Sequence, residues 1–144
     1  MGLESGLVTY LGARAGLTAI IDTRIFPQLV PQGANNYPAV TFQTISESNT
    51  HSLSGVSGLA MSRLQITCWG RTVLDALRVR DAVVDALDGY RGLMGSTTVQ
   101  SCLKLDERDM PATANASPEL AAARVYGRGI DFMFSYTEPV PSYA

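Results

Sequence analysis

The chain has 144 residues, which is the usual size of one domain and is long enough to bury one sizeable hydrophobic core. Hydrophobic residues make up 46% and charged residues 17%, a balance that excludes a globally disordered protein. A formal net charge of −2 argues against general binding to a nucleic-acid backbone, which needs a concentrated cationic face. We therefore expect one globular domain over residues 1–138 with a flexible tail at 139–144, and no sequence-specific nucleic-acid binding.

The first residues lack the basic start of a secretory leader, and Glu4 with several glycines interrupts any apolar span. We expect neither a membrane segment nor export by a signal peptide. Cys68 and Cys102 both lie in strand-like runs and are expected to be small buried hydrophobes rather than a disulfide pair. With a single histidine and no Cys-x-x-Cys motif in the chain, we expect no metal site. We also expect no cofactor.

Helical spacing of apolar residues predicts a first helix over residues 3–15, ended by Gly16 and Leu17 as a left-handed cap. A short apolar run from Ile20 to Phe26 follows, and Pro27 interrupts it. Residues 31–38 have the composition of turns and loops, and Tyr37 before Pro38 is expected to lead into a strand in extended conformation.

Alternating β-branched and aromatic residues predict strands over residues 40–45 and 63–69, which we expect to pair in antiparallel fashion. In the second of these strands Leu64 and Ile66 share one face, and Trp69 lies on the other. The segment between them, residues 46–58, is rich in serine and glycine and too long for a tight hairpin. It is expected to be a mobile loop.

Thr72 is positioned to cap a helix over residues 72–87, and Gly89 is a plausible terminator. Two further strands are predicted over residues 97–105 and 124–136, separated by a charged and then alanine-rich excursion over 106–123. The element order is therefore α-β-β-α-β-β. It predicts an α+β fold in which two helices pack on one side of a four-stranded, mainly antiparallel sheet.

Two groups of residues could in principle support catalysis. Asp106, Glu107 and Asp109 form an acidic cluster, which a solvated strand end with Arg108 as partner explains better. His51 is the natural general base of any hydrolase, but no Gly-x-Ser-x-Gly nucleophile motif accompanies it. We therefore expect a protein that is not an enzyme, with a small cytoplasmic hydrolase as the remote alternative.

Several short patterns occur in a fixed order along most of the chain. They are Arg24-Ile25-Phe26-Pro27, Pro31-Gln32-Gly33-Ala34 with Tyr37-Pro38, His51-x-Leu53-x-Gly55, Arg63-x-Gln65-Ile66-x-Cys68-Trp69 and Asp106-Glu107-Arg108-Asp109. Their order and spacing resemble the tail completion proteins, or tail terminators, of long-tailed bacteriophages and gene transfer particles. The resemblance implies an α/β subunit that forms a hexameric ring on the head-proximal end of the tail tube, stops tube polymerisation and offers the surface for head attachment.

The resemblance also implies partners and a location. The partners would be other copies of the chain in the ring, the major tail tube protein and the head-tail connector or neck proteins, while DNA passes through the ring. The protein would be assembled in the bacterial cytoplasm and reside in the virion tail, and a head-tail joining or neck protein is the alternative. The residues we expect to contact other subunits or the tube are His51, Leu53, Val56, Arg63, Trp69, Arg108, Asp109 and Met110.

Overall fold

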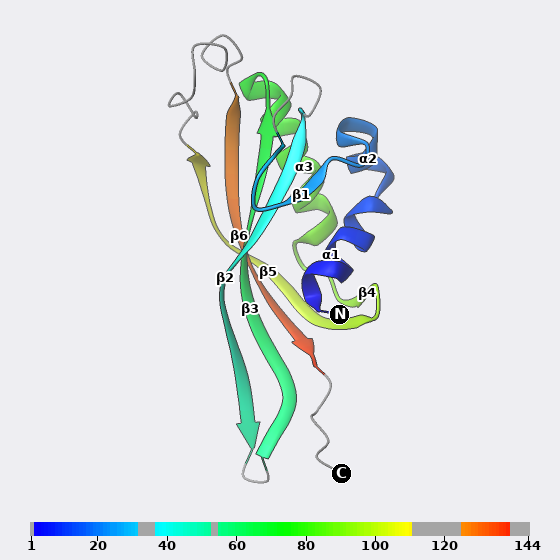
Figure 1. Cartoon of the computed structure of the whole chain (residues 1–144), viewed down its shortest axis with the longest axis vertical. Coiled ribbons are helices and arrows are strands. Elements are labelled where there is room, and N and C mark those ends of the chain that lie inside the picture. The colour runs from blue at the N-terminus through cyan, green and yellow to red at the C-terminus, as the bar shows by residue number, and fades with distance from the viewer. Residues whose placement is uncertain (1, 32–36, 53–54, 111–124, 139–144) are drawn as a thin grey trace.

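A computed structural model describes residues 2–31, 37–52, 55–110 and 125–138 of the chain (Figure 1). These residues form three helices and six strands and confirm the α+β class. In chain order they are α1 (Leu3–Gly12), α2 (Ala15–Ile21), β1 (Ile25–Pro27), β2 (Ala39–Ser52), β3 (Gly55–Gly70), α3 (Val73–Leu87), β4 (Gly92–Met94), β5 (Thr97–Met110) and β6 (Tyr126–Thr137).

The strands form one sheet in the order β1-β2-β3-β6-β5-β4. All neighbouring strands are antiparallel except β1, which runs parallel to β2. The predicted antiparallel pair is confirmed as β2 and β3, with Val40 opposite Cys68 and Phe42 opposite Ile66. At the centre of the sheet β3 pairs with β6, so two segments far apart in the sequence lie side by side (Figure 1).

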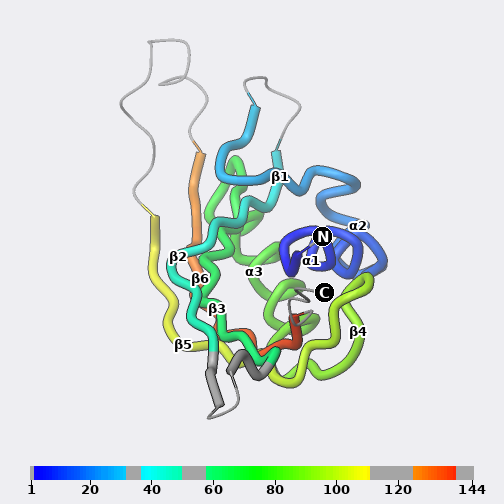
Figure 2. Tube along the Cα trace, turned by 60° about the horizontal axis from the view of Figure 1, so that its bottom comes forward, coloured from blue at the N-terminus to red at the C-terminus, as the bar shows by residue number. Residues whose placement is uncertain are grey.

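The helices gather on one side of the sheet, as predicted (Figure 2). Alternate residues of the strands face them, including Leu64 and Ile66 of β3 and Phe132 of β6, and all three side chains are fully buried. They belong to one core with apolar side chains from every helix, which are Leu3, Leu7, Tyr10, Leu11, Leu17, Ile21, Val79, Val83 and Leu87. Burial of such side chains contributes about 1.5–3 kcal/mol each and fixes which face of the sheet the helices cover.

Helix α3 begins and ends as the sequence predicts. The amide of Asp75 donates to the Thr72 hydroxyl at 3.1 Å, which is an N-cap hydrogen bond. After the helix, Gly89 has a positive φ of 83°, and its amide donates to the carbonyl of Cys102 at 2.7 Å. The end of the helix is therefore tied to β5.

The prediction of a single helix over residues 3–15 is wrong, because the helix ends at Gly12 and α2 starts at Ala15. Gly16 lies inside α2 rather than at a cap. The apolar run after it is divided between α2 and β1. Arg24 stabilises this junction, since its Nε donates to the carbonyl of Pro38 at 2.7 Å and its Nη2 to that of Ile20 at 3.1 Å.

The prediction of four strands is also wrong, because β1 and β4 add two strands of three residues each. Such short strands offer no alternating pattern long enough to detect in a sequence. The mobile loop expected over residues 46–58 is instead the paired ends of β2 and β3, apart from residues 53–54, which lie outside the described residues. Likewise Asp106–Met110, expected to begin an excursion, continue β5, while 111–124 and the tail 139–144 lie outside the described residues.

The two cysteines are free and buried, which confirms their prediction as small hydrophobes. Burial raises the pKa of both thiols well above the ordinary value, so both are protonated at neutral pH. Among the helices that the structure describes, none is long and apolar enough to cross a membrane.

Candidate interaction site

The sheet surface opposite the helices, which we call the open face, carries a buried carboxylate between two arginines. Because Leu64 and Ile66 point towards the helices, Arg63 and Gln65 of β3 lie on the open face. Arg63 Nη2 lies 2.7 Å from Oδ2 of Asp131, and Arg108 Nη2 lies 3.3 Å from its Oδ1. Arg108 Nη2 also donates to Oε1 of Gln65 at 2.6 Å.

Asp131 is only 3% exposed, although it lies on the face without helices. Burial opposes ionisation of this carboxyl, but hydrogen bonds from Arg63 and Arg108 outweigh burial and hold its pKa below the ordinary value. The two arginine side chains are each more than one-third exposed, so they reach from the carboxylate to the surface. The cluster therefore presents guanidinium groups in a fixed position to any partner on this face.

Trp69 packs over Gly127 of β6, beside this cluster. Its indole Nε1 donates to the Thr41 hydroxyl at 2.9 Å, and a Cβ added at Gly127 would lie 2.6 Å from Cζ3 of the ring. Met110 covers Gly129 in the same way, with its sulfur 2.9 Å from the position of an added Cβ. The two glycines thus leave the space that the indole and the thioether occupy.

The open face also has uncovered apolar side chains. Leu103 of β5 is 54% exposed and lies opposite Met133 of β6, which in turn lies opposite Arg63 of β3. Met61, two residues before Arg63 on the same face, is 37% exposed. Apolar, methionine, tryptophan and arginine side chains in one area are the composition of protein interfaces.

A second ionic cluster lies on the helix side and joins α3 to the sheet. Glu107 of β5 accepts hydrogen bonds from Arg80 of α3, Lys104 of β5 and Arg128 of β6 at 2.5–2.9 Å. These bonds, that of Arg80 foremost, outweigh burial and hold the pKa of Glu107 far below its ordinary value. Arg128 Nη1 also binds Asp109 Oδ1 at 2.7 Å.

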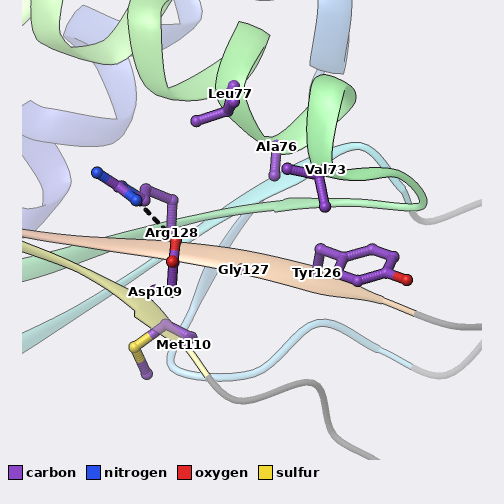
Figure 3. Close-up of a pocket in the computed structure, with 8 residues that line it drawn as sticks. All are labelled: Val73, Ala76, Leu77, Asp109, Met110, Tyr126, Gly127 and Arg128. Atoms are coloured by element: carbon purple, nitrogen blue, oxygen red, sulfur yellow. Dashed lines mark hydrogen bonds and ion pairs between the residues drawn. The ribbon is translucent and has the colours of Figure 1, made fainter.

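A small pocket opens beside this cluster, between the start of α3 and the ends of β5 and β6 (Figure 3). Its volume is about 210 Å³, below the range of about 300–1,000 Å³ typical of small-molecule sites. It is lined by Val73, Ala76, Leu77, Asp109, Met110, Tyr126, Gly127 and Arg128. A pocket of this size has room for a single side chain rather than for a metabolite.

The structure brings together four of the eight residues that the sequence singled out. Arg63, Trp69, Arg108 and Met110 converge on the open face, whereas Asp109 lies on the helix side of β5, against Arg128. His51 and Val56 are opposite each other at the far end of β2 and β3, and the placement of their side chains lies outside what is described. Leu53 itself lies outside the described residues.

Sequence reasoning missed Asp131, Gly127 and Gly129. A signal was available, because a strand that contains glycine at alternate positions often marks a close approach by another group. Within the described part of the chain, no group of three or more histidine, cysteine or acidic residues is placed to hold a metal ion.

No curated protein matches the chain. Among solved structures, the chain is similar to one from the "Virion of native gene transfer agent (GTA) particle", with 17% identity, 87% of each chain covered and a TM-score of 0.66. That likeness shows a shared fold. The family model described as "Tail completion protein gp17" matches residues 5–125, which is most of the sequence. The chain therefore belongs to the tail completion protein gp17 family.

Proposed function

We propose that the protein is a tail terminator, which caps the head-proximal end of the tail tube as a ring. The ring would stop tube polymerisation and provide the surface to which the head attaches. Family membership supports the broader part of this statement: a tail completion protein is a structural component of a phage-type tail. The proposed partners are other copies of the chain, forming a hexamer, the tail tube protein and the head-tail connector, with DNA passing through the ring.

The observation that carries the proposal is the open face. In a monomer with helices on one side of an antiparallel sheet, the other side is expected to be polar. Here Met61 and Leu103 are exposed beside Arg63 and Arg108, whose positions are fixed by the buried Asp131. Capping by such a surface requires no covalent chemistry, which agrees with a non-enzymatic role.

The experiment is electron microscopy of particles assembled after disruption of this gene, with tail length and head attachment scored together. Abnormally long tails without heads are expected for a terminator. Tails of normal length beside DNA-filled heads would instead identify a head-tail joining protein. Intact particles would contradict both structural roles.

The role of the open face is tested by complementation with Met61→Glu. A carboxylate placed in an apolar interface must be desolvated, so we expect loss of complementation with little change in stability. Val8→Glu is the matched control, because Val8 on α1 has nearly the same exposure, 38% against 37%. Equal complementation by both variants would contradict the assignment of this face.

His51→Ala and Asp109→Ala address the hydrolase alternative. Normal particle assembly by both variants is expected if catalysis plays no part, and loss of a defined hydrolytic activity in either variant would support the enzyme instead.

A further inference from the structure

The sheet has two long edges that are only partly covered. β1 pairs with β2 as far as Phe42, and β4 pairs with β5 as far as Val99. The turn after α3 extends the cover of β5 to Lys104, whose amide donates to Asp88. Within the described ranges, no strand lies against the outer side of residues 43–52 of β2 or 105–110 of β5.

Hydrogen bonds and strand register show which backbone groups of β2 face outward. The amide of Val40 and the carbonyl of Phe42 bond to the β1 side. Val40 lies opposite Cys68 of β3, and Phe42 lies opposite Ile66. Because backbone orientation repeats at every second pair of an antiparallel ladder, the β2 residues opposite Leu64, Ser62 and Ala60 also direct their amides and carbonyls away from β3. The outward-facing residues of the uncovered part are therefore Thr44, Glu47 and Asn49.

Backbone groups of β5 also face outward at alternate residues. The carbonyl of Cys102 and the amide of Lys104 face outward, because they bond to Gly89 and Asp88. Pairing with β6 resumes after the bulge at Leu105, and in that register the backbone amides and carbonyls of Glu107 and Asp109 face outward. The Glu107 amide is already bonded to Oδ1 of Asp106 at 2.8 Å. Among the residues that the structure describes, the Glu107 carbonyl and both backbone groups of Asp109 have no hydrogen-bond partner on this outer side.

We propose that the uncovered edge of β5 pairs with the uncovered edge of β2 in a second copy of this chain. The inference rests on the proposed ring and specifies its subunit contact. β2 and β5 run in opposite directions at opposite ends of the series β2-β3-β6-β5. When copies are related by rotation about an axis that runs along the strands, strand direction is kept, so β5 of one copy meets β2 of the next as an antiparallel partner, and every contact in the ring is the same.

Electrostatics and shape favour a second copy over an arbitrary peptide. The acidic side chains at the β5 edge are already neutralised within the chain, Glu107 by three basic groups and Asp109 by Arg128. An approaching strand thus meets little uncompensated charge. Both edges contain bulges, which limit pairing to a strand of matching shape. The pocket lined by Asp109 and Met110 lies beside the β5 edge and offers space for a side chain of the added strand (Figure 3).

The test compares Asn49→Pro and Asp109→Pro with Asn49→Ala and Asp109→Ala. Proline removes an outward amide but leaves the hydrogen bonds to β3 or β6 intact, whereas alanine removes only the side chain. One lost backbone hydrogen bond weakens each contact by about tenfold. We expect both proline variants to fail in ring assembly, measured by native mass spectrometry of the protein bound to tubes, while both alanine variants assemble.

Hydrogen exchange of the wild-type protein gives an independent readout that does not depend on how a proline variant folds. The amides of Thr44, Glu47, Asn49 and Asp109 should exchange at least about tenfold more slowly in assembled tails than in the free subunit. Unchanged exchange at these amides, or proline variants that assemble like their alanine controls, would overturn the edge pairing. The terminator function would still stand in that case, because tail length in the gene disruption tests it separately.

Discussion

Replacement of Gly127 by alanine should destabilise the protein through a single side-chain contact. The added Cβ would lie 2.6 and 2.8 Å from Cζ3 and Cε3 of Trp69 and 3.1 Å from Cβ of Met110. The indole must therefore move, which breaks its 2.9 Å hydrogen bond to Thr41. Overpacking costs about 1–3 kcal/mol and the lost hydrogen bond about 1 kcal/mol, so we expect a loss of about 2–4 kcal/mol.

Two measurements check this prediction. Urea unfolding gives the change in the free energy of unfolding, and fluorescence reports the local change, because Trp69 is the only tryptophan in the chain. We expect a red-shifted emission in the folded Gly127→Ala variant. Gly16→Ala is the matched control: it adds the same methyl group inside α2 with nothing within 4 Å, and should stabilise the protein by about 0.5–1 kcal/mol.

A double variant shows whether Trp69 is the cause. In a Trp69→Leu background the clash is relieved, so Gly127→Ala should cost at least about 1 kcal/mol less than in the wild type. A Gly127→Ala variant that loses less than about 0.5 kcal/mol with unchanged emission, or an equal loss in both backgrounds, would show that the indole does not block a side chain at this position.

Three further predictions concern stability and reactivity. The pKa of Glu107 is lowered by folding, so the ionised carboxylate stabilises the folded protein at pH values above the ordinary pKa of 4.5, and this stabilisation is lost as the pH falls towards the lowered pKa. Glu107→Gln should therefore weaken the dependence of the free energy of unfolding on pH in the acid range. An unchanged dependence would argue against the arginine and lysine contacts. Thr72→Ala removes the N-cap of α3 and should cost about 1 kcal/mol in urea unfolding, whereas Thr72→Ser should retain most of the stability. Burial of Cys68 and Cys102 predicts that neither thiol reacts with a thiol reagent before unfolding, and rapid labelling of the native protein would contradict the packing.

Elements with a strong local signal were predictable from the sequence. The helix after Thr72 has a cap, an apolar stripe and a glycine after its end, and the strand around Ile66 alternates clearly. The ends of β2 and β3 gave no such signal. Residues 43–49 of β2 are exposed to solvent, so no alternation of apolar and polar residues distinguishes this stretch from a loop.

The candidate site was predictable only in part. Arg63 and Trp69 belong to a pattern that is recognisable in the sequence, and both lie on the open face of β3. The carboxylate that holds Arg63 is 68 residues away in the sequence, and no local pattern links the two. The same holds for Arg108 and its partner Gln65, which meet only because β3, β6 and β5 are adjacent in the sheet.

The central pairing of β3 with β6 also has a consequence for how the chain folds. β3 ends at Gly70 and β6 begins at Tyr126, so the middle of the sheet cannot close until α3, β4 and β5 have been synthesised. Loop closure of this length makes folding slow compared with that of helical proteins. Before closure, the β2–β3 hairpin exposes the inner edge of β3 to solvent and to other nascent chains. The chain thus depends on a folding step that is faster than its collisions with unfinished neighbours.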